Sequence, residues 1–174
     1  MFGVIAMSSF ILLLQDIEAR DIHGTSKNDT LVGSDGNDRM YGGNGNDTLI
    51  GLLGNDEMTG DSGNDTLVGS DGDDYLVGGK NADIIRGEAG DDQMEGNSGN
   101  DMITGEDGDD TLIGGFGDDS LNGGRGNDNL FAGPGNDYLF GGPGIDYFDC
   151  GIGKDRVLDL NLTEGDIKNL NCEY

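Results

Sequence analysis

Fifteen aspartates recur at intervals of nine residues, and their carboxylates are the groups in this sequence best suited to bind metal ions. Calcium accepts roughly six to eight oxygen ligands in a flexible geometry, from carboxylates and backbone carbonyls. Magnesium requires a tighter octahedron, and zinc prefers Cys and His, of which the chain has two and one. The series therefore predicts calcium ligands at Asp29, Asp38, Asp47, Asp56, Asp65, Asp74, Asp83, Asp92, Asp101, Asp110, Asp119, Asp128, Asp137, Asp146 and Asp155.

The aspartate is the sixth residue of a nonapeptide that repeats without an insertion. The first residue is Gly in all repeats except at Ala132 and Cys150, and the fourth is Gly except at Lys27 and Asn81. An uninterrupted short period is the signature of a solenoid. The eighth residue is apolar in every repeat: Leu31, Met40, Leu49, Met58, Leu67, Leu76, Ile85, Met94, Ile103, Leu112, Leu121, Leu130, Leu139, Phe148 and Val157.

The first six residues of each repeat have the Gly and Asn content of a turn. Residues seven to nine are predicted to form a very short strand, in which only the eighth side chain points inward. Two repeats then make one coil of about 18 residues, so alternate aspartates line the same edge. Carboxylates stacked one coil apart repel each other unless a cation lies between them. The gaps between neighbouring turns predict multiple calcium ions, up to about thirteen.

The consensus G-G-x-G-x-D-x-U-x, with U apolar, is matched in full at Gly42–Ile50 and Gly123–Phe131. It resembles the calcium-binding repeats of RTX (hemolysin-type) proteins, and the resemblance extends from Gly24 to Leu158. It implies an all-β protein, a parallel β-roll (β-solenoid) of about fifteen nonapeptides, two per coil, with short terminal caps. Substitutions in the turns predict weaker calcium sites at Lys27, Asn81–Ala82, Ile145 and Lys154.

The composition limits the kinds of partner that the chain could bind and argues against catalysis. The formal net charge of -26 disfavours nucleic acid and anionic lipid, which are polyanions. Apolar residues make up 33% of the chain, too few for the wide core of an ordinary globular enzyme. His23 lies before the first repeat, and no H-E-x-x-H or G-x-S-x-G motif occurs. We therefore expect no enzyme and no membrane span. The expected partners are calcium ions, with self-association or a glycan or cell-surface partner as further options.

The sequence divides into three segments. Residues 1–22 begin with fourteen residues that carry no charged side chain. They are interpreted as an export signal, with a cap over the first coil or a membrane anchor as alternatives. Residues 23–158 form the predicted calcium-binding roll. Residues 159–174 break the period and are predicted to cap the open end of the sheets.

Cys150 and Cys172 flank the C-terminal segment. They predict a disulfide that ties the cap to the roll, the alternative being two buried free thiols. A disulfide favours an oxidising, extracellular location. Aromatic side chains gather near the same end: Phe148 is expected to point inward, and the others outward, beneath the tail or toward a partner, at Phe131, Tyr138, Phe140 and Tyr147.

The favoured function is a secreted calcium-binding roll that acts as a structural, surface or extracellular-matrix module and needs calcium to fold. A filament subunit that stacks end to end and a detached repeat domain of a larger RTX enzyme or toxin remain as alternatives. Ice binding is disfavoured because it needs a regular ladder of outward Thr or Asn. The third position shows no such ladder, since it reads Ser26, Asp35, Asn44 and Leu53.

Overall fold

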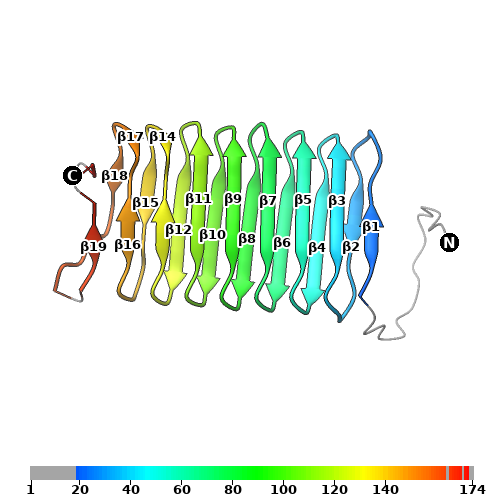
Figure 1. Cartoon of the computed structure of the whole chain (residues 1–174), viewed down its shortest axis with the longest axis horizontal. Coiled ribbons are helices and arrows are strands. Elements are labelled where there is room, and N and C mark those ends of the chain that lie inside the picture. Colours follow the sequence, from blue (N-terminus) through cyan, green and yellow to red (C-terminus); the bar gives the residue numbers. More distant parts are fainter. Residues whose placement is uncertain (1–18, 164, 170, 173–174) are drawn as a thin grey trace.

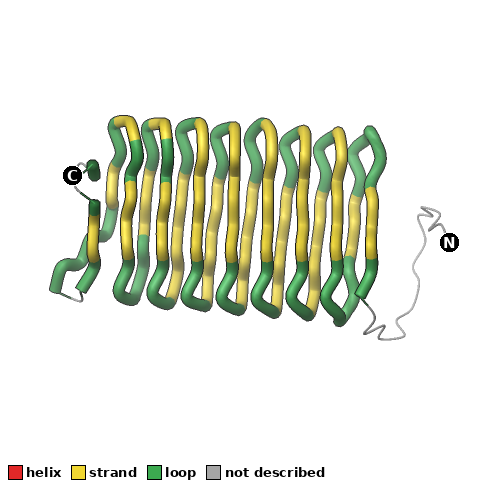
Figure 2. Tube along the Cα trace, viewed as in Figure 1, coloured by secondary structure: helices red, strands yellow, loops and turns green. Residues whose placement is uncertain are grey.

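The structure is a stack of flattened coils formed by parallel strands (Figure 1). This computed structural model describes residues 19–163, 165–169 and 171–172, so the interpretation of residues 1–14 as an export signal falls outside the described residues. The described residues form strands and turns but no helix, and none of them forms a helix able to cross a membrane (Figure 2). The predicted all-β solenoid is therefore confirmed.

Two parallel sheets face each other, and the chain alternates between them. The first sheet has the order β1-β3-β5-β7-β9-β11-β13-β16-β19, and the second has the order β2-β4-β6-β8-β10-β12-β15-β18. The strands of the first sheet are β1 Asp21–His23, β3 Arg39–Asn44, β5 Glu57–Ser62, β7 Tyr75–Lys80, β9 Gln93–Ser98, β11 Thr111–Phe116, β13 Asn129–Phe131, β16 Tyr147–Asp149 and β19 Ile167–Lys168. The strands of the second sheet are β2 Thr30–Val32, β4 Thr48–Leu53, β6 Thr66–Asp71, β8 Ile84–Ala89, β10 Met102–Asp107, β12 Ser120–Arg125, β15 Tyr138–Phe140 and β18 Arg156–Val157. A further short pair joins β14 Pro134–Gly135 to β17 Ile152–Gly153.

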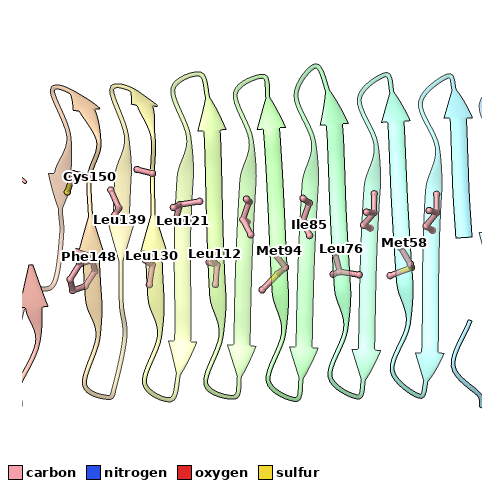
Figure 3. Packing of buried hydrophobic residues seen from close by; sticks show 14 of the residues in the cluster. Met58, Leu76, Ile85, Met94, Leu112, Leu121, Leu130, Leu139, Phe148 and Cys150 are labelled. Atoms are coloured by element: carbon pink, nitrogen blue, oxygen red, sulfur yellow. The ribbon is translucent and has the colours of Figure 1, made fainter. Parts of the chain in front are cut away.

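The register of the sheets confirms two repeats per coil. Met40 pairs with Met58 in the first sheet, and Leu49 pairs with Leu67 in the second, so paired residues are 18 apart. The same register places the eighth-position side chains in a column between the sheets (Figure 3). From Leu31 to Phe148 all of these side chains are buried, and Val157 is partly buried. The core is therefore narrow, with one main apolar side chain per repeat.

The strands are longer than predicted. From β3 to β12 each strand has six residues and continues through the first three positions of the next repeat. Within positions seven to nine only the eighth side chain points inward, as predicted, and the longer strands bury the first position of the next repeat as well, as at Gly60. The first residue of the next repeat follows the eighth residue by two positions, so strand alternation places both on the inner face. Ala132 and Cys150, which replace Gly there, join the core.

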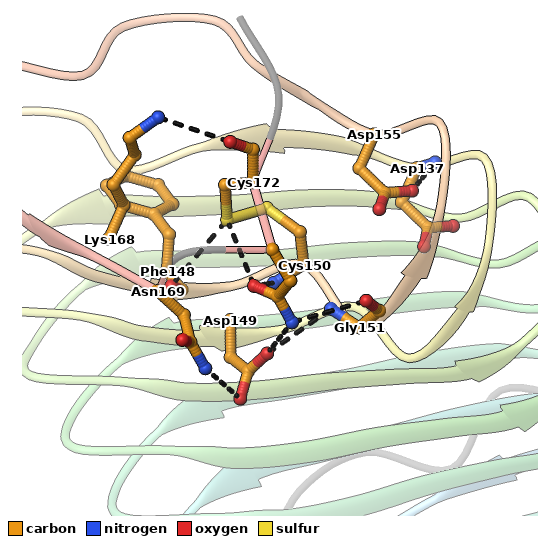
Figure 4. The surroundings of a disulfide bond; sticks show 10 residues. Asp137, Phe148, Asp149, Cys150, Gly151, Asp155, Lys168, Asn169 and Cys172 are labelled. Atoms are coloured by element: carbon orange, nitrogen blue, oxygen red, sulfur yellow. Dashed lines mark hydrogen bonds between the residues drawn. A yellow bond between two sulfur atoms is a disulfide. The ribbon is translucent and has the colours of Figure 1, made fainter.

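The C-terminal segment returns to the first sheet. Its strand β19 pairs with β16, so that Tyr147 lies opposite Ile167. The predicted disulfide between Cys150 and Cys172 is confirmed (Figure 4). Beside it, the side-chain amide of Asn171 donates a hydrogen bond of 2.7 Å to Asp149 Oδ1. The segment is thus attached to the roll by backbone, side-chain and covalent contacts.

Exposed aromatic side chains correct one expectation about this end. Tyr138 and Phe140 remain 47% and 40% exposed, so packing beneath the tail is wrong for both. They lie on β15 of the second sheet, whereas the tail strand β19 extends the first sheet. The ring of Phe131 contacts the ring of Tyr147 on the first sheet, and Phe148 is buried as expected.

Replacing both cysteines with alanine is expected to lower the free energy of unfolding of the C-terminal end by roughly 3 kcal/mol, because the bond closes a loop of about 23 residues. Alanine already occupies the buried first position at Ala132, so the Cys150→Ala/Cys172→Ala variant leaves the turn intact. Thermal unfolding at saturating calcium measures the loss. Reduced wild-type protein is the control and should match the variant; equal melting of the variant and the oxidised protein would contradict the prediction.

Candidate metal sites

The fifteen repeat aspartates form two rows, one along each edge of the roll. The first row lies in the turns that follow strands of the first sheet, along the upper edge in Figure 1, and comprises Asp29, Asp47, Asp65, Asp83, Asp101, Asp119, Asp137 and Asp155. The second row lies along the lower edge and comprises Asp38, Asp56, Asp74, Asp92, Asp110, Asp128 and Asp146. All of these side chains except Asp29 are buried, with at most 3% exposed.

One oxygen of each carboxylate links neighbouring coils. The backbone N–H of Asp56 donates a hydrogen bond of 2.7 Å to Oδ1 of Asp74, and the N–H of Asp74 donates one of 2.8 Å to Oδ1 of Asp92. The same bond joins every consecutive pair in both rows, at 2.7–3.0 Å. This ladder fixes each carboxylate inside its turn and directs it along the row.

The second oxygen is buried without a donor. Among the described residues, no hydrogen-bond donor contacts Oδ2 of Asp47, Asp56, Asp65, Asp74, Asp83, Asp92, Asp101, Asp110, Asp119, Asp128, Asp137 or Asp155. A buried carboxylate oxygen without a partner is costly, because burial removes water that would otherwise solvate its charge. A repeated feature of this kind fits a site whose missing partner is a cation.

First-position glycines keep a space open beside these oxygens. A Cβ atom on Gly42 would lie 2.7 Å from Oδ2 of Asp47 and 2.8 Å from the carbonyl oxygen of Gly60 in the next coil. The carboxylate oxygen and the carbonyl oxygen therefore border the same small space. Within the described part of the chain, no three Asp, Glu, His or Cys side chains converge. The donor set is thus carboxylate and carbonyl oxygen, which suits calcium and does not suit zinc.

Burial raises the pKa of these carboxyl groups. The pKa of Asp92 rises to about 8, first because of burial and then because of the charges of Asp110, Asp74 and Asp73. Burial is the main cause throughout, and the hydrogen bond from the preceding Asp N–H opposes it. The pKa is about 7 for Asp74, Asp83, Asp128 and Asp137, and about 6 for Asp56, Asp65, Asp101 and Asp110. Without a cation, neutral pH therefore leaves many of these groups partly protonated.

The first turn of each row differs from the rest. Oδ2 of Asp29 accepts hydrogen bonds from the N–H and the hydroxyl of Thr25, at 2.6 and 2.7 Å. Oδ2 of Asp38 accepts from the N–H and the hydroxyl of Ser34, at 2.5 and 2.9 Å. In the first turn of each row, Oδ2 of the aspartate therefore accepts hydrogen bonds from the protein. Farther along each row, Oδ2 of the aspartates named above has no such donor among the described residues.

Sequence reasoning missed a second ladder at the fifth position. The N–H of Asn64 donates to Oδ1 of Asn46, and the N–H of Asp109 donates to Oδ1 of Asp91. Asn or Asp occupies this position in twelve of the fifteen repeats, a pattern from which the ladder could have been predicted. Ala82 has no acceptor to contribute, and Asn81 adopts a left-handed φ of 73°, as its replacement of Gly requires.

The tail also supplies an aspartate that the nine-residue period did not reveal. Oδ1 of Asp166 accepts the N–H of Asp146 at 3.1 Å, although the two residues are 20 apart. Its other oxygen accepts the N–H of Asn161 at 2.6 Å. Asp166 therefore extends the second row by one hydrogen-bonded step.

Comparison with known proteins agrees with this geometry. The family model described as "RTX calcium-binding nonapeptide repeat (4 copies)" matches residues 23–58, 59–94, 87–121, 95–130 and 113–148. A comparison with curated proteins found no match.

Proposed function

Because the chain belongs to the RTX calcium-binding nonapeptide repeat family, we propose that it is a secreted roll whose folding depends on calcium held between successive turns. The main support for this proposal is that Oδ2 of one repeat aspartate after another is buried without a hydrogen-bond donor among the described residues. The fifteen repeat aspartates would hold up to about thirteen ions, together with carbonyl oxygens of the turns. Bound calcium would neutralise the negative charge of the buried carboxylates.

An extracellular, non-catalytic role fits the chemistry of the chain. Extracellular calcium modules commonly have dissociation constants of about 0.1–1 mM, so such sites fill outside the cell and stay empty inside it. The Cys150–Cys172 disulfide persists in an oxidising compartment. We propose that the folded roll serves as a rigid structural module at a cell surface or in an extracellular matrix.

Calcium stoichiometry tests the assigned ligands. Asp74→Asn removes a buried carboxylate that borders the gaps on both of its sides, so this variant is expected to bind about two fewer calcium ions than the wild type. Asn keeps an Oδ1 acceptor for the N–H of Asp56, so the ladder can survive. Equilibrium dialysis at 10 times the saturating calcium concentration measures the number of bound ions, and circular dichroism checks that the variant is folded.

Asp71→Asn is the matched control, because Asp71 belongs to the same repeat, at the end of β6, but is exposed. It is expected to bind as many ions as the wild type. Equal losses of bound calcium in the Asp74→Asn and Asp71→Asn variants would show that the sixth-position aspartates are not the ligands.

A further inference from the structure

The two rows of aspartates lie in turns of very different charge. Positions two to five of the second-row turns carry one basic residue, Arg125, and eight acidic ones, namely Asp35, Asp71, Asp73, Glu88, Asp91, Glu106, Asp107 and Asp109. The same positions of the first-row turns carry two acidic residues, Asp61 and Asp118, and three lysines, Lys27, Lys80 and Lys154. The excess negative charge of the chain outside the sixth position is therefore concentrated along one edge.

Three of these charges are stacked directly beside the second-row aspartates. Asp73, Asp91 and Asp109 occupy the fifth position in consecutive coils, next to Asp74, Asp92 and Asp110. The N–H of Asp91 donates to Oδ1 of Asp73 at 3.1 Å, and the N–H of Asp109 donates to Oδ1 of Asp91 at 2.9 Å. These bonds hold the carboxylates in line along the edge. The corresponding first-row positions hold the neutral side chains of Asn64, Ala82 and Asn100.

Resting on the proposed function, we propose that the two rows form two classes of calcium site, and that the second row fills at lower calcium concentration than the first. A unit negative charge about 7 Å from a divalent ion raises its affinity by roughly threefold at 0.1 M salt. The two second-row gaps between Asp74 and Asp110 each lie beside two fifth-position carboxylates, whereas the first-row gaps between Asp47 and Asp101 lie beside none. These central sites should therefore differ between the rows by about tenfold. Between the two midpoints, only one edge of the roll would carry calcium.

Two matched triple variants isolate the charge from the geometry. Asp73→Asn/Asp91→Asn/Asp109→Asn removes three charges from the second row, and every substituted side chain keeps its Oδ1 acceptor. Asn46→Asp/Asn64→Asp/Asn100→Asp adds three charges at the same position of the first row. Oδ1 of Asn46 and Oδ1 of Asn100 each accept an N–H from the next coil, and Asp keeps that acceptor. Both sets exchange residues that the fold already accepts at the fifth position.

A calcium titration followed by ¹⁵N NMR separates the two classes of site. It gives a midpoint in free calcium concentration for the backbone amide signals of each row. In the wild type, the central second-row signals, at Asp74, Asp92 and Asp110, should reach their midpoint at about tenfold lower calcium than the first-row signals from Asp47 to Asp101. Removing the three charges should raise the midpoint of the central second-row signals about tenfold and shift the first row less than about twofold. Adding three charges to the first row should lower its midpoint by a similar factor, and about 0.5 M salt should narrow the gap between rows.

Coincident titration of the two rows in the wild type, or equal shifts of both rows in a variant, would overturn the two-class proposal and leave calcium-dependent folding intact. Equilibrium dialysis supplies the distinguishing measurement. A chain that binds no calcium at 10 mM, with unchanged amide signals, would overturn the proposed function together with this inference.

Discussion

Removal of calcium at pH 7 is expected to convert the compact roll into an extended acidic chain. The core contains little more than one apolar side chain per nine residues, so its burial alone stabilises the fold weakly. The buried carboxylates repel one another along each row, and the whole chain carries a formal charge of -26. Calcium offsets both effects, so its binding free energy becomes folding free energy.

Far-UV circular dichroism and small-angle X-ray scattering, first with excess chelator and then with millimolar calcium, measure this transition. The radius of gyration should fall from about 44 Å for an unfolded chain of this length to about 16 Å. Magnesium at the same concentration is the control and should restore little strand signal, since it requires a tighter octahedral site. A chelated protein that stays compact and rich in strands would contradict calcium-dependent folding.

Acidification is expected to replace calcium partially, so the calcium-free chain should become more compact as the pH falls from about 8 toward 5. Burial raises the pKa of Asp92 to about 8 and of Asp74 and Asp83 to about 7 in the folded state. The folded state therefore holds more protons than the unfolded state between about pH 4 and pH 8. Its free energy of unfolding must then decrease as the pH rises through this range.

The calcium-bound protein should respond in the opposite direction. Protons compete with calcium for the same carboxylates, so the calcium midpoint should move to higher concentration as the pH falls. Scattering and circular dichroism across pH 5–8, with and without calcium, measure both effects. A calcium-free chain that is most compact at pH 8, or a calcium midpoint that does not change with pH, would be inconsistent with burial of these carboxylates.

Much of the fold could be predicted from the sequence because a solenoid repeats one set of contacts. Once Asp, Gly and an apolar residue recur at fixed positions of a nonapeptide, each coil must meet the next in the same register. The 18-residue pairing of Met40 with Met58 and the column from Leu31 to Phe148 followed from that period. The assignment of aspartates to two rows required no further information.

The tertiary structure decided how deeply the aspartates are buried and which partner each oxygen has. Composition gives no means of predicting that Oδ1 of Asp74 accepts the N–H of Asp56 while its Oδ2 faces the space beside Gly69, since both depend on the exact stacking of coils. The long strands arise for the same reason, because a glycine at the first position permits the backbone of the next coil to approach closely.

The C-terminal segment shows the limit of periodicity most clearly. Its residues do not repeat, so no internal comparison predicts that β19 joins the first sheet or that Asp166 accepts the N–H of Asp146. Those contacts form between segments that are not related by the period, and they depend on the path of one particular loop. The sequence by itself therefore determined the repeated contacts of this protein, whereas only the tertiary structure decided the contacts that occur once.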